Sequence, residues 1–328
     1  MLVTADRVFG GHLYVRNGKI AAISDDGTLP AREELDAAGL YVLPGMLDCH
    51  AHINDPGFTW REDLPHASEA AAVGGVTTLI DMPLQNTPPL TSADAFANKL
   101  AVFEGRSLVD YALWGGLVTD NTAELAGMDA AGAVGFKAFI APVSLGYSSV
   151  DMGLAREALF RIKAFGGLAG FHCEDHALIC AGEAKAKAGG GTRRAFLDSR
   201  PVVAEVIATA NVIELARETG ARVHICHVSH PRVAELVRRA QADGLSVTGE
   251  TCPHYLVFTE ENLLLCGTVF KCAPPLRTAE ARDGLWEYVL DGTLSCIGSD
   301  HSPSRPDEKD EAVHGVMGAW GGLSGLQS

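Results

Sequence analysis

One segment separates two different patterns in this sequence: Pro44-Gly45-Met46-Leu47-Asp48-Cys49-His50-Ala51-His52. It is a proline-glycine turn followed by an apolar run that ends in two histidines. After it, apolar runs typical of buried strands alternate with helical patterns as far as residue 300. We therefore predict two domains, a small one over residues 1–43 and a larger one over residues 44–328.

Eight strands are predicted in the larger domain, most of them followed by a helix. Their runs are apolar on both faces, which is typical of parallel strands that are covered on both sides. Eight alternating units indicate an α/β fold, a closed (β/α)8 TIM barrel, with an open doubly wound sheet as the alternative. The strands are expected at residues 46–52, 76–81, 108–115, 134–140, 168–172, 222–228, 245–250 and 294–300. The helices are expected at residues 67–73, 92–103, 151–165, 201–218, 231–242 and 279–290.

Two further segments have their own expected structures. The first 43 residues predict a small β subdomain, because Asn17-Gly18, a dipeptide favoured in tight hairpin turns, separates two short apolar runs. Residues 185–194, between the fifth and sixth expected strands, are basic and rich in glycine. This excursion is expected to be a solvated loop.

The composition is that of a globular protein, with 328 residues of which 47% are hydrophobic and 20% are charged. The formal net charge of −15 argues against nucleic acid or an anionic membrane as the main partner. We recognise no signal peptide and no membrane-spanning segment. The eight cysteines form no CxxC pair, which favours reduced thiols in a cytoplasmic protein over a disulfide framework.

Metal-ligand residue types lie at the carboxyl ends of the expected strands, where the active sites of barrels are built. His50 and His52 are two residues apart, so their imidazoles point to the same side of the first strand. His172 and His227 lie in the fifth and sixth strands, and Asp300 ends the eighth. A single histidine at a strand end is more often structural. The matching set predicts a site for Zn²⁺ or a similar divalent ion.

Lys137 lies in an otherwise apolar strand, residues 134–140. A buried ammonium group is costly unless it is paired or neutralised. The residues leave two interpretations open. The lysine reaches solvent or forms a salt bridge, or its neutral amine adds CO₂ to form a carbamate whose two oxygens bridge two cations.

Residues 44–327 resemble the cyclic amidohydrolases, a family of allantoinases, hydantoinases (dihydropyrimidinases) and dihydroorotases. The similar stretches occur in the same order as in the family and cover most of the chain. They are residues 44–52, 74–78, 135–137, 172–174, 226–229, 251–255, 272–277 and 298–303.

The resemblance implies a carboxylated lysine (N6-carboxylysine) at Lys137 and two divalent metal ions, zinc first, with cobalt, manganese or iron as alternatives. By the same resemblance, one ion is held by the carbamate together with His50, His52 and Asp300. The other is held by the carbamate together with His172 and His227.

The resemblance also implies a mechanism. A hydroxide that bridges the two ions attacks the ring carbonyl, and Asp300 is the catalytic residue that takes its proton and delivers it to the leaving nitrogen. His224 lies three residues before His227 and is interpreted as structural. Asp48 shares the parity of His50 and is a weaker candidate for a residue that orients a ligand.

The residues after His52 indicate which ring is the substrate. Dihydroorotases resemble HxHxRxPG, where the arginine holds the substrate carboxylate, and this chain has Asn54 at that position. Asparagine does not replace a bidentate carboxylate clamp, which disfavours dihydroorotase. The motifs favour an allantoinase, which converts allantoin to allantoate, with hydantoinase as the alternative. A catalytically inert interaction protein is the non-enzyme alternative, which the filled ligand positions disfavour.

Several residues are expected to contact the substrate. Hydantoinases carry a tyrosine as oxyanion donor five residues after the carboxylated lysine, where this chain has Pro142. Ser144, Tyr147 or Ser148 are candidates to replace it. The expected substrate-binding residues are Asn54, His254, Cys272, Ala273 and Gly322.

Members of the family continue beyond the point where this sequence stops. We therefore expect the chain to lack the last barrel helix and the rest of the small β subdomain. Apolar surface exposed in this way favours aggregation, so the 328-residue chain alone is expected to be poorly soluble. The full-length form is expected to be a homotetramer that acts on a small cyclic amide or ureide.

Overall fold

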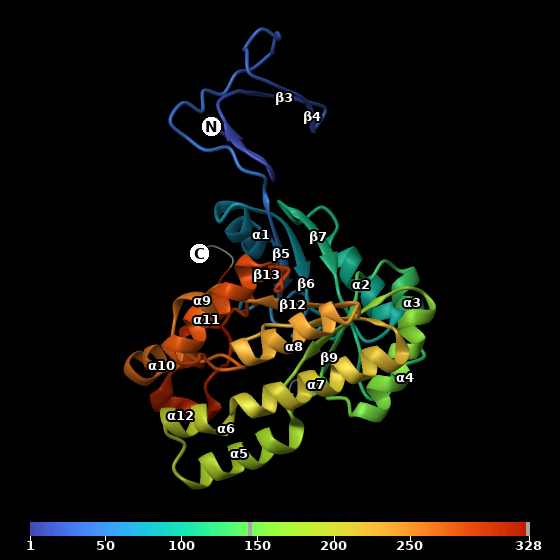
Figure 1. Cartoon of the computed structure of the whole chain (residues 1–328), viewed down its shortest axis with the longest axis vertical. Helices are drawn as coiled ribbons and strands as arrows, with labels where there is room; N and C mark the ends of the chain where they lie inside the picture. Colours follow the sequence, from blue (N-terminus) through green and yellow to red (C-terminus); the bar gives the residue numbers. More distant parts are fainter. Residues whose placement is uncertain (144–145, 326–328) are drawn as a thin grey trace. The chain divides into compact units, whose positions relative to one another are not determined.

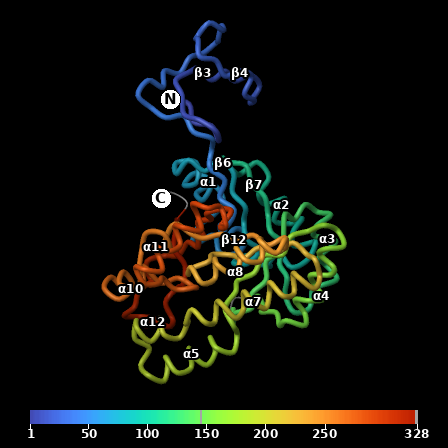
Figure 2. The backbone as a smooth tube through the Cα atoms, in the orientation of Figure 1, coloured from blue at the N-terminus to red at the C-terminus, as the bar shows by residue number. Residues whose placement is uncertain are grey.

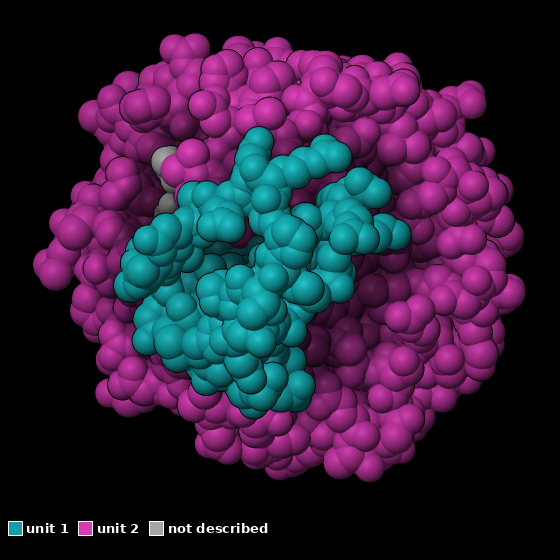
Figure 3. Space-filling model, turned by 90° about the horizontal axis from the view of Figure 1, so that it is seen from above, with its two compact units in different colours: residues 1–46 teal, residues 47–328 magenta. Residues whose placement is uncertain are grey.

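Residues 1–143 and 146–325 are described by a computed structural model. The chain divides into two units, residues 1–46 and residues 47–328 (Figure 3). In the smaller unit, β1 (Leu2–Val3) pairs with β2 (Val8–Phe9), and β3 (His12–Arg16) pairs with β4 (Lys19–Ser24). Asn17 and Gly18 both have positive φ, 53° and 71°, as a two-residue hairpin turn requires. The predicted hairpin is confirmed.

The larger unit is the predicted (β/α)8 barrel, and its chain path can be followed in Figure 2. Parallel strands follow one another around it in chain order, and β7 and β8 are two segments of one strand interrupted at Trp114. The barrel closes at an isolated parallel bridge between Ala51 and His301, where the His52 amide donates to the His301 carbonyl (2.7 Å). The strands are β5 (Met46–Ala51), β6 (Val76–Asp81), β7 (Asp110–Leu113), β8 (Gly115–Gly116), β9 (Phe136–Phe139), β10 (Leu168–His172), β11 (Arg222–Ile225), β12 (Val247–Thr251) and β13 (Cys296–Ile297).

Helices surround the strands on the outside (Figure 1). The helix α8, for example, buries an apolar stripe with Val233, Val237 and Ala240. None of the helices in the described residues is long and apolar enough to cross a membrane. The helices are α1 (Leu64–Val73), α2 (Ala93–Phe103), α3 (Leu125–Ala130), α4 (Met152–Ala164), α5 (His176–Ala188), α6 (Arg193–Ser199), α7 (Val202–Thr219), α8 (Pro231–Ala242), α9 (Pro253–Val257), α10 (Glu260–Cys266), α11 (Ala279–Leu290) and α12 (Glu311–Gly318), with 3-10 turns η1 (Thr268–Phe270) and η2 (Pro306–Lys309).

The prediction of a solvated loop at residues 185–194 is wrong for most of its length. Residues 185–188 form the last turn of α5, and Arg193 begins α6. Lys185 and Lys187 are favourable at a helix C-terminus because they face its negative dipole end. Thr192 caps α6 by accepting a hydrogen bond from the Ala195 amide (3.2 Å). Only the glycines and Thr192 between the two helices form a loop.

A fully buried ion pair joins α2 to the barrel. Lys99 of α2 pairs with Asp81, the last residue of β6, and both side chains are inaccessible to solvent. The Asp81 carboxylate also accepts a hydrogen bond from the Ile53 amide (2.6 Å), and the Lys99 ammonium donates to the Ile53 carbonyl (3.1 Å). The pair therefore fixes the backbone that follows His52.

We expect Lys99→Met to destabilise the protein by about 3–5 kcal/mol, because it leaves the buried Asp81 carboxylate without its cation. Urea unfolding of the variant and of Lys187→Met, which removes an exposed lysine, measures the difference. Adding Asp81→Asn to Lys99→Met should recover part of the loss. Equal unfolding free energies for Lys99→Met and the control would contradict the role of the pair.

Candidate metal centre

The six predicted ligand residues lie around one cavity of about 510 Å³. His50 is the last residue but one of β5 and His52 directly follows that strand, and the Nε2 atoms of both lie close to the same oxygen of Asp300, at 3.2 and 3.1 Å. The rings of His172 and His227 are 4.5 Å apart, and the His227 ring lies 5.5 Å from that of His50. The three histidine-bearing strand ends and Asp300 thus converge, as the spacing predicts.

Lys137 lies inside this ring of imidazoles. Its side chain is fully buried, and its Nζ has no hydrogen-bond partner among the described residues. The aromatic ring of Phe139, two residues along β9, lies 5.2 Å from that nitrogen. A fully buried amine with no partner is costly, so its environment calls for a chemical change or a ligand.

The donor set fits divalent metal ions. The ligand atoms of His50, His52 and Asp300 all lie within 4.8 Å of one another. The Nδ1 atoms of His52 and His227 are buried and have no hydrogen-bond partner in the part of the chain that the structure describes. Imidazole and carboxylate are ligands of zinc and of other first-row divalent ions.

The backbone is strained at two of these residues. His227 and Asp300 have φ of 39° and 47°, values that residues other than glycine rarely adopt. Such strain costs about 1–3 kcal/mol at each site and persists where the surrounding structure enforces it. The strand β13 ends at Ile297 and not at residue 300 as expected.

Glu250 of β12 holds the ring of His50 and was missed in the sequence. Its Oε1 bonds the Nδ1 of His50 and also accepts a hydrogen bond from the His227 amide (3.2 Å). Burial alone would raise the pKa of Glu250, but His50 and His224 hold it well below its ordinary value. The carboxylate is therefore charged and leaves the Nε2 of His50 facing the cavity, the arrangement typical of metal-bound histidine.

Glu174 holds His172 and was also missed. Its Oε2 lies 2.7 Å from the Nε2 of His172, and the same oxygen pairs with Arg200. Burial opposes ionisation of Glu174, but Arg200 and His172 lower its pKa to about 2. A signal was present in the sequence, because Glu174 lies two residues after His172 and points to the same side of the chain.

Asp48 and His224 make different contacts from the predicted metal ligands. The Asp48 carboxylate accepts from the amides of His50 (3.2 Å) and Ser299 (2.9 Å). It therefore positions the backbone of two ligand segments and does not touch a ligand side chain. His224 bonds Thr248 through Nδ1 (2.8 Å) and lies 3.4 Å from Glu250 through Nε2, in agreement with its interpretation as structural.

The five expected substrate-binding residues differ in whether they line the cavity. Ala273 lines the cavity. The other four are not among the described residues that line it: Asn54, His254, Cys272 and Gly322. Asn54 is fully buried, and a side chain at Gly322 would collide with Ser302. Their roles stay predictions.

Two of the three expected oxyanion donors, Tyr147 and Ser148, are already engaged. The Tyr147 hydroxyl donates to the Lys137 carbonyl (2.6 Å) and is buried, which raises its pKa. Ser148 Oγ lies 2.8 Å from the Thr119 hydroxyl, and Ser144 is outside the described residues. Pro142 lines the cavity at the position where hydantoinases carry the tyrosine.

Known proteins were compared with this chain. A profile of the dihydro-orotase-like family matches residues 39–232. An allantoinase from Streptomyces avermitilis is 41% identical over 329 residues, which is 99% of this chain and 73% of that protein. This chain belongs to the cyclic amidohydrolase family. Among the cyclic amidohydrolases, an allantoinase from Deinococcus radiodurans is 38% identical and covers 100% of the chain and 73% of its own length.

Solved cyclic amidohydrolases have the same fold. The L-hydantoinase (dihydropyrimidinase) of Arthrobacter aurescens superposes with a TM-score of 0.95 at 37% identity, over 100% of this chain and 73% of that one. A D-hydantoinase superposes with a TM-score of 0.89 at 29% identity, over 99% and 73%. Both support the predicted barrel.

We expect Glu250→Gln to weaken metal binding about 10- to 100-fold, because the amide no longer holds the His50 ring as a charged acceptor. Competition with a chelator measures the affinity, and Glu214→Gln on the exposed face of α7 is the matched control. Unchanged affinity in Glu250→Gln would exclude the orienting role.

A pH dependence is expected from two lysines near the cavity. Burial, followed by repulsion from Arg200, lowers the pKa of Lys271 to about 8, and burial lowers the pKa of Lys309 to about 8. Between about pH 8 and the ordinary lysine pKa of 10.5, the unfolded chain binds more protons than the folded chain. Their contribution to the unfolding free energy therefore rises with pH in this window.

Lys309→Met should flatten this rise between about pH 8 and pH 10. Urea unfolding at three pH values in the window measures it, with Lys187→Met as the control that keeps both buried amines. Parallel curves for the wild type and Lys309→Met would rule out the effect.

Proposed function

We propose that this protein is an allantoinase, a metal-dependent hydrolase that opens the amide ring of allantoin to give allantoate. The observation that carries the metal-dependent reaction is the convergence of four imidazoles, Asp300 and the unpartnered Lys137 amine on one cavity. Three allantoinases support the choice of ring, including that of Escherichia coli, 40% identical over 96% of this chain.

The charged groups in the cavity wall favour an uncharged ring. Arg200 and Lys271 line the cavity, and a substrate carboxylate would need a free cation. Arg200 is paired with Glu174 and Glu183, and the Lys271 ammonium donates to two backbone carbonyls (3.0 and 2.6 Å). Both cations are engaged, which disfavours dihydroorotate.

A polar acceptor in the wall suits a substituted ureide. Gln85 lines the cavity, and its Oε1 is buried without a hydrogen-bond partner among the described residues. Its Nε2 donates to Ser302 Oγ (3.2 Å), which fixes the orientation of the amide. An N–H group of the ureide side chain of allantoin would satisfy Gln85 Oε1, and hydantoin lacks that side chain. A hydantoinase remains the second candidate, supported by the L-hydantoinase structure.

In the proposed site, Lys137 reacts with CO₂ through its neutral amine and releases one proton, so that the carbamate carries a negative charge. Together with the carbamate, one divalent ion, taken as zinc, would be held by His50, His52 and Asp300. The second would be held by the carbamate with His172 and His227. Bound ions of this kind supply a strong nucleophile at neutral pH and polarise a carbonyl group.

Asp300 is the proposed acid and base. His50 and His52 hold its pKa far below the ordinary value although burial opposes ionisation, so it is a carboxylate at neutral pH. It can accept the proton of the attacking water and deliver it to the ring nitrogen as the amide bond breaks. The cations of the cavity wall are engaged by other groups, and the wall excludes bulk solvent. It would therefore orient the neutral ring toward Asp300.

Location and assembly remain further proposals. The described cysteines are free thiols, which supports a cytoplasmic location. A homotetramer is the assembly we propose for the full-length form, and light scattering would measure it.

The test is a ring-opening screen of allantoin, hydantoin, dihydrouracil and dihydroorotate with the zinc-loaded chain. Allantoin should have the highest kcat/KM. Asp300→Asn should lower kcat by about 10²–10⁴-fold, with bound metal measured in the same samples, and the exposed Asp307→Asn is the control. Dihydroorotate as the best substrate would overturn the argument from the engaged cations. A chain with neither bound divalent ions nor activity would favour the inert interaction protein.

A further inference from the structure

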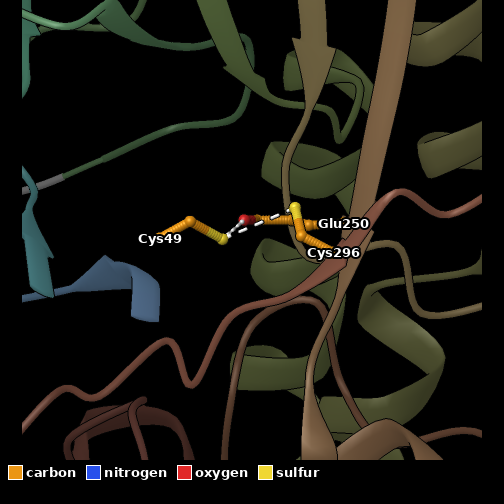
Figure 4. Close-up of side chains that lie close together, drawn as sticks. All are labelled: Cys49, Glu250 and Cys296. Carbon is orange, nitrogen blue, oxygen red and sulfur yellow. Dashed lines mark hydrogen bonds between the residues drawn. The ribbon is translucent and has the colours of Figure 1, made fainter. Parts of the chain in front are cut away.

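A second cluster of donor atoms, from Cys49, Glu250 and Cys296, lies at the oxygen of Glu250 that does not bond His50 (Figure 4). The Cys49 thiol lies 3.5 Å from the Cys296 sulfur and 3.2 Å from Glu250 Oε2. The Nε2 of His224 lies 3.4 Å from the same oxygen. The carboxylate thus serves two groups of residues, with Oε1 on His50 and Oε2 on this cluster.

The distances are those between the ligands of a tetrahedral zinc ion. Zinc binds sulfur at about 2.3 Å and nitrogen or oxygen at about 2.0–2.2 Å, which places neighbouring ligand atoms about 3.3–3.8 Å apart. The Cys49 sulfur lies 3.2 Å from Glu250 Oε2 and 3.5 Å from the Cys296 sulfur, and the donor atoms of these three residues all lie within 4.8 Å of one another. We propose that Cys49, Cys296 and Glu250 hold a zinc ion at a site separate from the six-ligand centre, with His224 positioning the Glu250 carboxylate.

The surrounding structure holds these donors in place. Thr248 bonds the Nδ1 of His224 (2.8 Å), which leaves its Nε2 directed at Glu250. At Gly298, an added Cβ would lie 3.1 Å from Glu250 Oε2 and 3.2 Å from the Cys49 sulfur. Only a glycine lets the chain pass this close to the donors.

The site joins strands where the barrel has few hydrogen bonds. Cys49 is in β5 and Cys296 is in β13, the two strands on either side of the closure. In the described residues, an isolated bridge between Ala51 and His301 joins these parts of the chain. Glu250 comes from β12. An ion bound here would tie three neighbouring strands together.

The donor chemistry selects the ion. Two thiols and a carboxylate are a mixed set that suits zinc and excludes magnesium and calcium, which take oxygen ligands. Zinc displaces the protons of thiols as it binds, so the thiols need not be ionised beforehand. Cys49 and Cys296 are partly exposed, which gives an ion access to the cluster.

The test uses the full chain, freed of metal under reducing conditions and titrated with Co²⁺. The wild type and Cys180→Ser, which removes an exposed thiol elsewhere, should show a thiolate-to-cobalt charge-transfer band. Cys296→Ser should lose that band and one equivalent of bound metal. An unchanged band and stoichiometry in Cys296→Ser would overturn the site. Failure of this site and failure of the proposed function can be told apart. The six-ligand centre has only nitrogen and oxygen donors, so it does not give the thiolate-to-cobalt band.

Alkylation of the wild type keeps the proposal testable if Cys296→Ser does not fold. Zn²⁺ should protect Cys49 and Cys296 from iodoacetamide, as read by peptide mass mapping. The exposed Cys180 and Cys266 should react equally with and without the ion. The proposal would be overturned if Zn²⁺ failed to protect Cys49 and Cys296, or if the two formed a disulfide in place of binding zinc.

Discussion

The buried amine of Lys137 is the constraint on which the rest of the site depends. It is fully buried and has no hydrogen-bond partner among the described residues, and it lines the same cavity as four imidazoles. An ammonium group there would repel any cation and would lower the affinity of the histidines for protons and for metal alike. A carbamate reverses the sign of that charge. The same position then attracts the ions for which the histidines are arranged.

Buried carboxylates stabilise this arrangement from outside. Glu250 and Glu174 are held in the charged state by their partners, although burial opposes ionisation. Each fixes the ring of one histidine, and each is itself fixed by a further group, His224 or Arg200. The geometry of the ligands thus depends on an outer layer of charges as much as on the strands.

The sequence predicted the barrel and six candidate ligand residues but not that outer layer. The histidines and Asp300 were predicted as ligands because they lie at expected strand ends, and the ends of parallel strands meet at one face of a barrel. For Lys137 the residues left two interpretations open, and its role as a ligand came from the resemblance to the family. Glu250 was not predicted, because its partner His50 is 200 residues away and no local pattern links them. The helices α5 and α6 were missed because glycines and basic residues are typical of loops, while the caps that begin these helices are short polar residues common in loops as well.

The closure of the barrel has a thermodynamic consequence. Ala51 forms the closing bridge with His301, and it lies between His50 and His52, while His301 follows Asp300. Opening the seam would therefore separate the ligands of one ion in the same event. Strand closure and ion retention then belong to one cooperative unit, and occupancy would raise the free energy of opening by RT ln(1 + [L]/Kd). The bound ion would stabilise the closed barrel, and its exchange rate would be limited by how often the seam opens.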